Sequence, residues 1–119
     1  MIPILNTAAA ILTMGFGLMG FLAPAWTAGA LDLRPDGSTM GLSEMRASVG
    51  GLFVVAGAAA LWLNQPLGWA MLGFVYAGAA TGRFLSVLLD APPLGKALAF
   101  GGIEAAMAIW LLAANLGQK

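Results

Sequence analysis

Apolar residues fill the chain in four long, nearly uninterrupted segments and do not alternate with polar ones. The segments cover residues 2–22, 45–63, 67–89 and 94–116, each close to the roughly 20 residues with which a helix crosses the hydrocarbon of a membrane. They are too long and too continuous for the strands of a membrane barrel. The pattern predicts an all-α integral membrane protein. We expect one four-transmembrane-helix bundle over residues 1–119, built from two helical hairpins.

Prolines and polar residues mark the joins between these segments. Pro24 follows the first segment, residues 64–66 separate the second from the third, and residues 90–93 separate the third from the fourth. Proline and the residue before it resist continuation of a helix, so the last two joins are expected to be tight turns. The first join, residues 23–43, is a long loop that could cover one end of the bundle.

Small residues indicate how the helices pack. The chain has 17 glycines, and in lipid, helices associate by close backbone approach over small residues. Gly78 and Gly82 form a GxxxG pair. We expect this pair to pack within the bundle, with a homodimer contact as the alternative.

Aromatic and basic residues indicate how the spans would lie in a membrane. The tryptophans fall toward the ends of spans, where their rings are expected at headgroup depth; they are Trp26, Trp62, Trp69 and Trp110. Arg34, Arg46 and Lys96 lie on the side of the first and third joins, against Lys119 on the other. The positive-inside rule then predicts that the more basic side is cytoplasmic and that both termini lie outside.

Composition excludes several classes of function. Hydrophobic residues make up 61% of the chain and charged residues 8%, and five basic residues balance five acidic ones, so no basic surface for nucleic acid is expected. The absence of Cys and His removes thiolate nucleophiles, imidazole bases and the usual zinc and haem ligands. We therefore expect no metal and no cofactor. An enzyme would have to rely on carboxylates with Arg and Tyr76, and no nucleophile motif favours one.

Arg83 and Glu104 are the charged residues placed deepest within apolar segments. Arg83 lies about 12 Å along its helix from the turn at Ala91, and Glu104 lies about 15 Å along the next helix, so the two reach nearly equal depth. Either charge alone would cost at least about 2.5–3.5 kcal/mol on insertion scales, which predicts an ion pair. Asp90 and Tyr76 are each seven residues from Arg83 and share its face, Asp90 as a competitor for the guanidinium.

Glu44 and Arg46 stand at the start of the second span. They are two residues apart and so lie on different faces of a helix, which means that each needs another partner. One interpretation is a helix start at the membrane interface, with Ser43 as the N-cap and Glu44 at the positive end of the helix dipole. The other places both residues with Arg83 and Glu104 in one polar cluster.

These residues together resemble a known family of bacterial membrane proteins, named domain of unknown function 4345. The resemblance extends over nearly the whole chain from the first loop onward. It implies a small four-helix protein of the bacterial cytoplasmic (inner) membrane whose four charged residues belong together, and it implies no activity. The shared features, in chain order, are Glu44-x-Arg46-Ala47, Gly50-Gly51, Gly82-Arg83, an Asp-x-Pro turn at Asp90, and Glu104.

The sequence thus leads to three hypotheses. The first is a non-enzymatic membrane-embedded binding or accessory protein for a lipid or small amphipathic ligand. Its ligand-binding residues would be Glu44, Arg46, Arg83, Glu104, Tyr76 and Asp90. The second is a dimeric transporter or channel for small molecules or ions, with Glu104 as a proton-coupled carboxylate, and the third is a structural subunit of a larger membrane complex. Expected partners are membrane lipids, such a ligand, and a second copy or a membrane-complex partner, but no nucleic acid.

Overall fold

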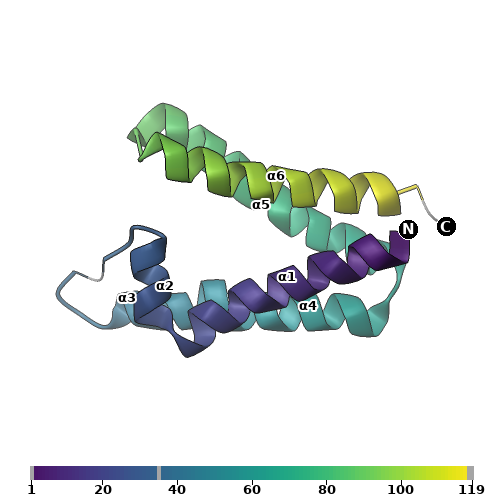
Figure 1. Ribbon diagram of the computed structural model, residues 1–119, viewed down its shortest axis with the longest axis horizontal. Helices are drawn as coiled ribbons and strands as arrows, with labels where there is room; N and C mark the ends of the chain where they lie inside the picture. Colours follow the sequence, from purple (N-terminus) through teal and green to yellow (C-terminus); the bar gives the residue numbers. More distant parts are fainter. Residues whose placement is uncertain (1, 35, 118–119) are drawn as a thin grey trace. The chain divides into compact units, whose positions relative to one another are not determined.

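The computed structural model describes residues 2–34 and 36–117, and within these residues the chain is helical without strands. Four of its helices are long and apolar enough to cross a membrane, which indicates an integral membrane protein. The contacts group the chain into two compact units, residues 3–62 and residues from 63 onward. In chain order, the helices are α1 (Ile2–Leu22), α2 (Pro24–Ala30), α3 (Met40–Glu44), the π-helix η1 (Met45–Gly51), α4 (Leu52–Leu63), α5 (Pro66–Asp90) and α6 (Leu94–Asn115) (Figure 1).

Three of the four spans begin and end within a residue or so of their predicted limits. The second span differs because it begins at Met40, five residues before the predicted start, and runs through α3, η1 and α4 to Leu63. Thr39 is therefore the N-cap residue, and its carbonyl accepts the backbone N–H of Ser43 at 3.1 Å. The prediction of Ser43 as the N-cap was wrong, because Ser43 lies inside the first turn of the helix.

The first join is not a plain loop, because its first part forms the short helix α2. Pro24 lies in the first turn of α2, where a backbone N–H would have no acceptor within the helix, so the lack of one in proline costs no hydrogen bond. Asp32 ends the helix with φ of 64°, and the N–H of Leu33 donates to the carbonyl of Ala28 at 2.8 Å. The Thr27 hydroxyl also donates to the Met19 carbonyl at 2.7 Å, which fastens α2 to the end of α1.

In the first unit, α1 lies against η1 and α4 with the two backbones in direct contact. A Cβ added at Gly17 would lie 2.6 Å from the Val54 nitrogen, and one at Gly50 would lie 2.7 Å from the Phe21 nitrogen. Only glycine allows this approach. Gly78 and Gly82 on α5 make no such contact with α6, because a Cβ added at either would meet no atom of that helix within 4 Å, and their packing within the bundle stays a prediction.

The second unit consists of α5 and α6, which run side by side (Figure 1). Asn64 makes the turn into α5 with φ of 44°, and its side-chain oxygen accepts the indole N–H of Trp69 at 3.2 Å. Trp69 is only 3% exposed, whereas Trp26 and Trp62 are exposed, and the predicted place of these rings at the headgroups stays a prediction. Lys119, which entered the orientation argument, lies outside the described residues.

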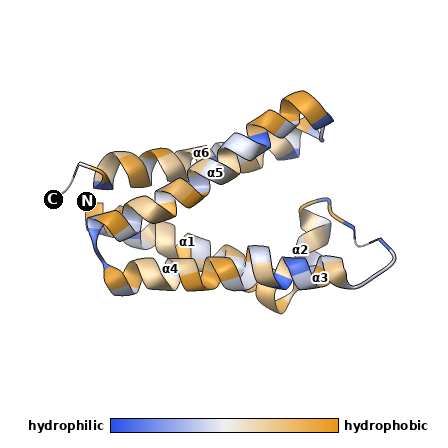
Figure 2. Cartoon of the chain, turned by 180° about the vertical axis from the view of Figure 1, so that it is seen from behind, coloured by the Kyte–Doolittle hydropathy of each residue, from blue (hydrophilic) through white to orange (hydrophobic). Residues whose placement is uncertain are grey.

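Small residues are buried between the helices and large apolar residues are exposed, as expected for helices in lipid. Small residues such as Ala9, Ala10 and Gly17 on α1, and Ala97 and Gly101 on α6, are buried, while many leucines and phenylalanines are exposed. Hydrophobic colours dominate the four long helices in Figure 2, and blue gathers at the joins and around the start of the second span. The exposed apolar surface is the surface that a membrane would cover.

Candidate functional site

The candidate site lies between α5 and α6, where a glycine lets the two helices come close. A Cβ added at Gly101 on α6 would lie 2.8 Å from the Phe84 ring and 3.2 Å from Cγ of Arg83. Any larger residue at this position would meet the aromatic ring and the arginine stem. Gly101 therefore makes room for the Arg83 side chain to cross from α5 toward α6.

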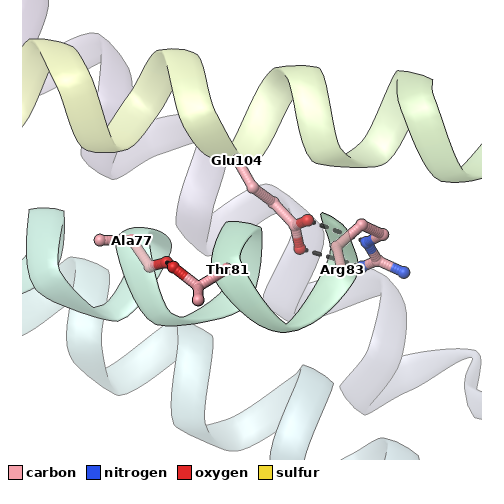
Figure 3. Close-up of polar contacts among 4 residues, drawn as sticks. All are labelled: Ala77, Thr81, Arg83 and Glu104. Atoms are coloured by element: carbon pink, nitrogen blue, oxygen red, sulfur yellow. Dashed lines mark hydrogen bonds and ion pairs between the residues drawn. The ribbon is translucent and has the colours of Figure 1, made fainter. Parts of the chain in front are cut away.

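Arg83 and Glu104 form a bidentate ion pair across these two helices. Nε of Arg83 donates to Oε1 of Glu104 at 2.9 Å, and Nη2 donates to Oε2, also at 2.9 Å (Figure 3). Two parallel bonds to one carboxylate fix the orientation of the guanidinium plane. The predicted contact between the two side chains is confirmed. Neither side chain is fully enclosed, because the Arg83 side chain is 35% exposed and that of Glu104 is 16% exposed.

The guanidinium of Arg83 also lies over an aromatic ring and keeps unused donors. Its Cζ is 5.4 Å from the centroid of the Phe100 ring, within the range of a cation–π contact. A guanidinium has five N–H groups, of which Glu104 takes one from Nε and one from Nη2. Both N–H groups of Nη1 and one of Nη2 have no acceptor among the described residues of α5 and α6.

Glu44 and Arg46 have partners inside the first unit. Nη1 of Arg46 donates to the carbonyl of Phe21, which belongs to the last turn of α1 and so lacks a partner within that helix. The Ser48 hydroxyl donates to Oε2 of Glu44 at 3.0 Å. Both charged side chains are exposed. A single cluster of these two residues with Arg83 and Glu104 stays a prediction.

The two other predicted site residues, Asp90 and Tyr76, lie on the same helix as Arg83. Asp90 accepts the hydroxyl of Ser86 at 2.8 Å, and the carboxylate that Arg83 binds is that of Glu104. Tyr76 is buried. A similar local bond ties Thr81, whose hydroxyl donates to the Ala77 carbonyl at 2.7 Å (Figure 3). Among the charged and phenolic candidates of α5 and α6, the structure thus joins Arg83 to Glu104.

Sequence reasoning missed Phe100 and Gly101 as parts of this site. Phe100 precedes Glu104 by four residues and therefore shares its helix face, which is a signal that could have identified the ring. Gly101 gave no such signal, because many glycines in the chain meet no neighbour at all. In the described part of the chain, no three acidic residues gather in a way that could hold a metal ion.

The arrangement presents hydrogen-bond donors on a guanidinium that is held in place. Its charges cancel, its donors are fixed in direction, and its exposed edge consists of N–H groups. Such an edge recognises oxygen acceptors.

No curated protein and no solved structure matches the chain. The family model described as Domain of unknown function (DUF4345) matches residues 2–115, nearly the whole chain, and the protein belongs to this family.

Proposed function

We propose that the protein is a non-enzymatic, membrane-embedded binding protein for a lipid or small amphipathic ligand. Arg83 holds an oxygen-bearing group of the ligand, Glu104 orients the guanidinium and balances its charge, and Phe100 supports its plane. One observation carries the proposal: the Arg83 guanidinium is fixed by two bonds yet retains three N–H groups and an exposed edge.

The depth of the pair in its helices supports this role. α5 has 25 residues, which is about 37 Å of helix, compared with about 30 Å for the hydrocarbon of a bilayer. Arg83 lies seven residues before the end of α5, or about 10 Å, so an α5 centred in a bilayer would carry the ion pair below the surface of the hydrocarbon. Ionisable residues at such depth are costly and commonly mark functional sites.

Two other functions explain the site less well. A proton-coupled transporter would need a carboxylate with an oxygen open to water, but both oxygens of Glu104 accept N–H groups of the Arg83 guanidinium. A structural subunit would use the ion pair only to fix helix register. Apolar residues of similar volume often replace a buried pair without loss of stability, so register alone gives little reason to keep these charges.

The experiment compares the wild type with a charge-swapped protein, Arg83→Glu with Glu104→Arg. The swap keeps one opposite-charge pair between α5 and α6 but moves the guanidinium from α5 to α6, which changes the direction of its unused N–H groups. Each protein is purified in a mild detergent, its thermal unfolding is measured, and the lipids and metabolites that accompany it are extracted and identified by mass spectrometry.

The wild type is expected to retain a specific molecule that the swapped protein has lost, while the two proteins unfold at similar temperatures. Arg34→Leu, which removes an exposed arginine in the first join, is the matched control and should retain the molecule. Equal retention by the wild type and the swapped protein would reject the binding function. An empty wild type with unchanged stability in the swap would favour the structural subunit.

A further inference from the structure

We infer that the group which Arg83 binds is an uncharged oxygen acceptor, such as the carbonyl of an ester or ketone, and not an anion. This inference rests on the proposed function and narrows its ligand class. It follows from the geometry of the unused donors and from the charges around them.

Two of the unused N–H groups can share a single small acceptor. Because Nε and one N–H of Nη2 face Glu104, the other N–H of Nη2 and one N–H of Nη1 lie together on the adjacent edge of the planar guanidinium. In Figure 3, a terminal nitrogen of Arg83 points away from Glu104. A carbonyl oxygen has two lone pairs and can accept one N–H from each of these nitrogens.

The charge around this edge is already balanced. Arg83 and Glu104 sum to zero, so an anionic ligand would leave one uncompensated negative charge in apolar surroundings. The side chains at the site are the rings of Phe84 and Phe100, which carry no charge. An uncharged acceptor uses the same N–H groups without that penalty.

The nearest further charges do not offset an anion. Lys96 precedes Glu104 by eight residues on α6, which is about 12 Å along the helix. Asp90 follows Arg83 by seven residues on α5 and adds a second carboxylate. The charged residue that follows Arg83 most closely on its own helix is therefore another carboxylate, and the basic residue of α6 lies about 12 Å along the axis from Glu104.

The carbonyl could belong to a membrane lipid or to a free amphiphile, and two matched ligand pairs separate these sources. The first pair is phosphatidylcholine and phosphatidylglycerol with identical acyl chains, which differ in net charge. The second is methyl oleate and oleyl sulfate, of which only the first is uncharged. Each pair is offered in competition to the full-length protein in a neutral detergent, and bound species are counted by native mass spectrometry.

The wild type should prefer the member with zero net charge in the pair it binds by about tenfold or more, which corresponds to about 1.4 kcal/mol. Glu104→Gln keeps an oxygen for Arg83 but removes the balancing charge, so the preference should move toward the anionic member. Asp36→Asn makes the same change of net charge at an exposed position in the first join and should leave the preference unchanged.

The outcomes separate this inference from the proposed function. A wild type that binds the anionic member equally or better, while binding still disappears in the charge-swapped protein, would overturn the inference and leave the binding function standing. Binding that is the same in the wild type and the swapped protein would overturn both. The wild-type competition decides the inference even when Glu104→Gln does not fold.

Discussion

Replacement of Gly17 by alanine should separate α1 from the helix it contacts. A Cβ at this position would lie 2.6 Å from the Val54 nitrogen and 2.8 Å from the Gly50 oxygen, and both are backbone atoms that cannot move aside alone. Overpacking of this kind costs about 1–3 kcal/mol. Alanine also favours a helix over glycine by about 0.5–1 kcal/mol, which acts in the opposite direction.

Gly15 provides a matched control in the same helix, two residues away. A Cβ at Gly15 meets nothing within 4 Å, so Gly15→Ala gains the higher helix propensity of alanine without overpacking. Because the helix contribution cancels between the two variants, their free energies of unfolding should differ by about 1–3 kcal/mol, with Gly17→Ala the less stable.

The two variants are compared in detergent micelles by titration with a denaturing detergent, with far-ultraviolet circular dichroism as the signal. If Gly17→Ala unfolds with the same free energy as Gly15→Ala, the backbones of α1 and α4 do not lie as close as the structure places them. The explanation of the first unit by glycine packing would then be wrong.

Two further predictions concern single positions. Ala91 ends α5 with φ of 49°, a conformation that disfavours residues with a Cβ. Ala91→Gly should therefore raise the free energy of unfolding by about 0.5–1 kcal/mol. A decrease of that free energy in the same titration would contradict the prediction. Arg46→Leu leaves the Phe21 carbonyl at the end of α1 without its donor and should lower the free energy of unfolding by about 0.5–1.5 kcal/mol, whereas Arg34→Leu should have no measurable effect.

Hydropathy predicted the long helices because the length of a span depends on the run of apolar residues and little else. It could not predict α2, which has seven residues and depends on contacts such as the bond from Thr27 to the Met19 carbonyl. It also could not predict the π-helix η1. This segment contains Gly50, whose close contact with the chain at Phe21 is a tertiary feature that no local pattern records.

The pairing of Arg83 with Glu104 was predictable because the cost of a lone charge in an apolar helix leaves few alternatives. The same reasoning failed to find the bond of Arg46, because its acceptor is a backbone carbonyl 25 residues away and every residue has such a carbonyl. The burial of Trp69 was not predictable for a related reason, because its ring is held by the side chain of Asn64 at the turn, a contact that hydropathy does not record.

The two arginines within the apolar spans therefore differ in what their contacts explain. Arg46 completes the end of α1 and is exposed near the start of the second span, so a structural role accounts for it. Arg83 bonds to no carbonyl at a helix end, and its bonds to Glu104 leave three N–H groups of a partly exposed guanidinium without an acceptor in α5 or α6. Since a charge at that depth costs more than one at the interface, the unexplained donors of Arg83 are the stronger reason to look for a ligand.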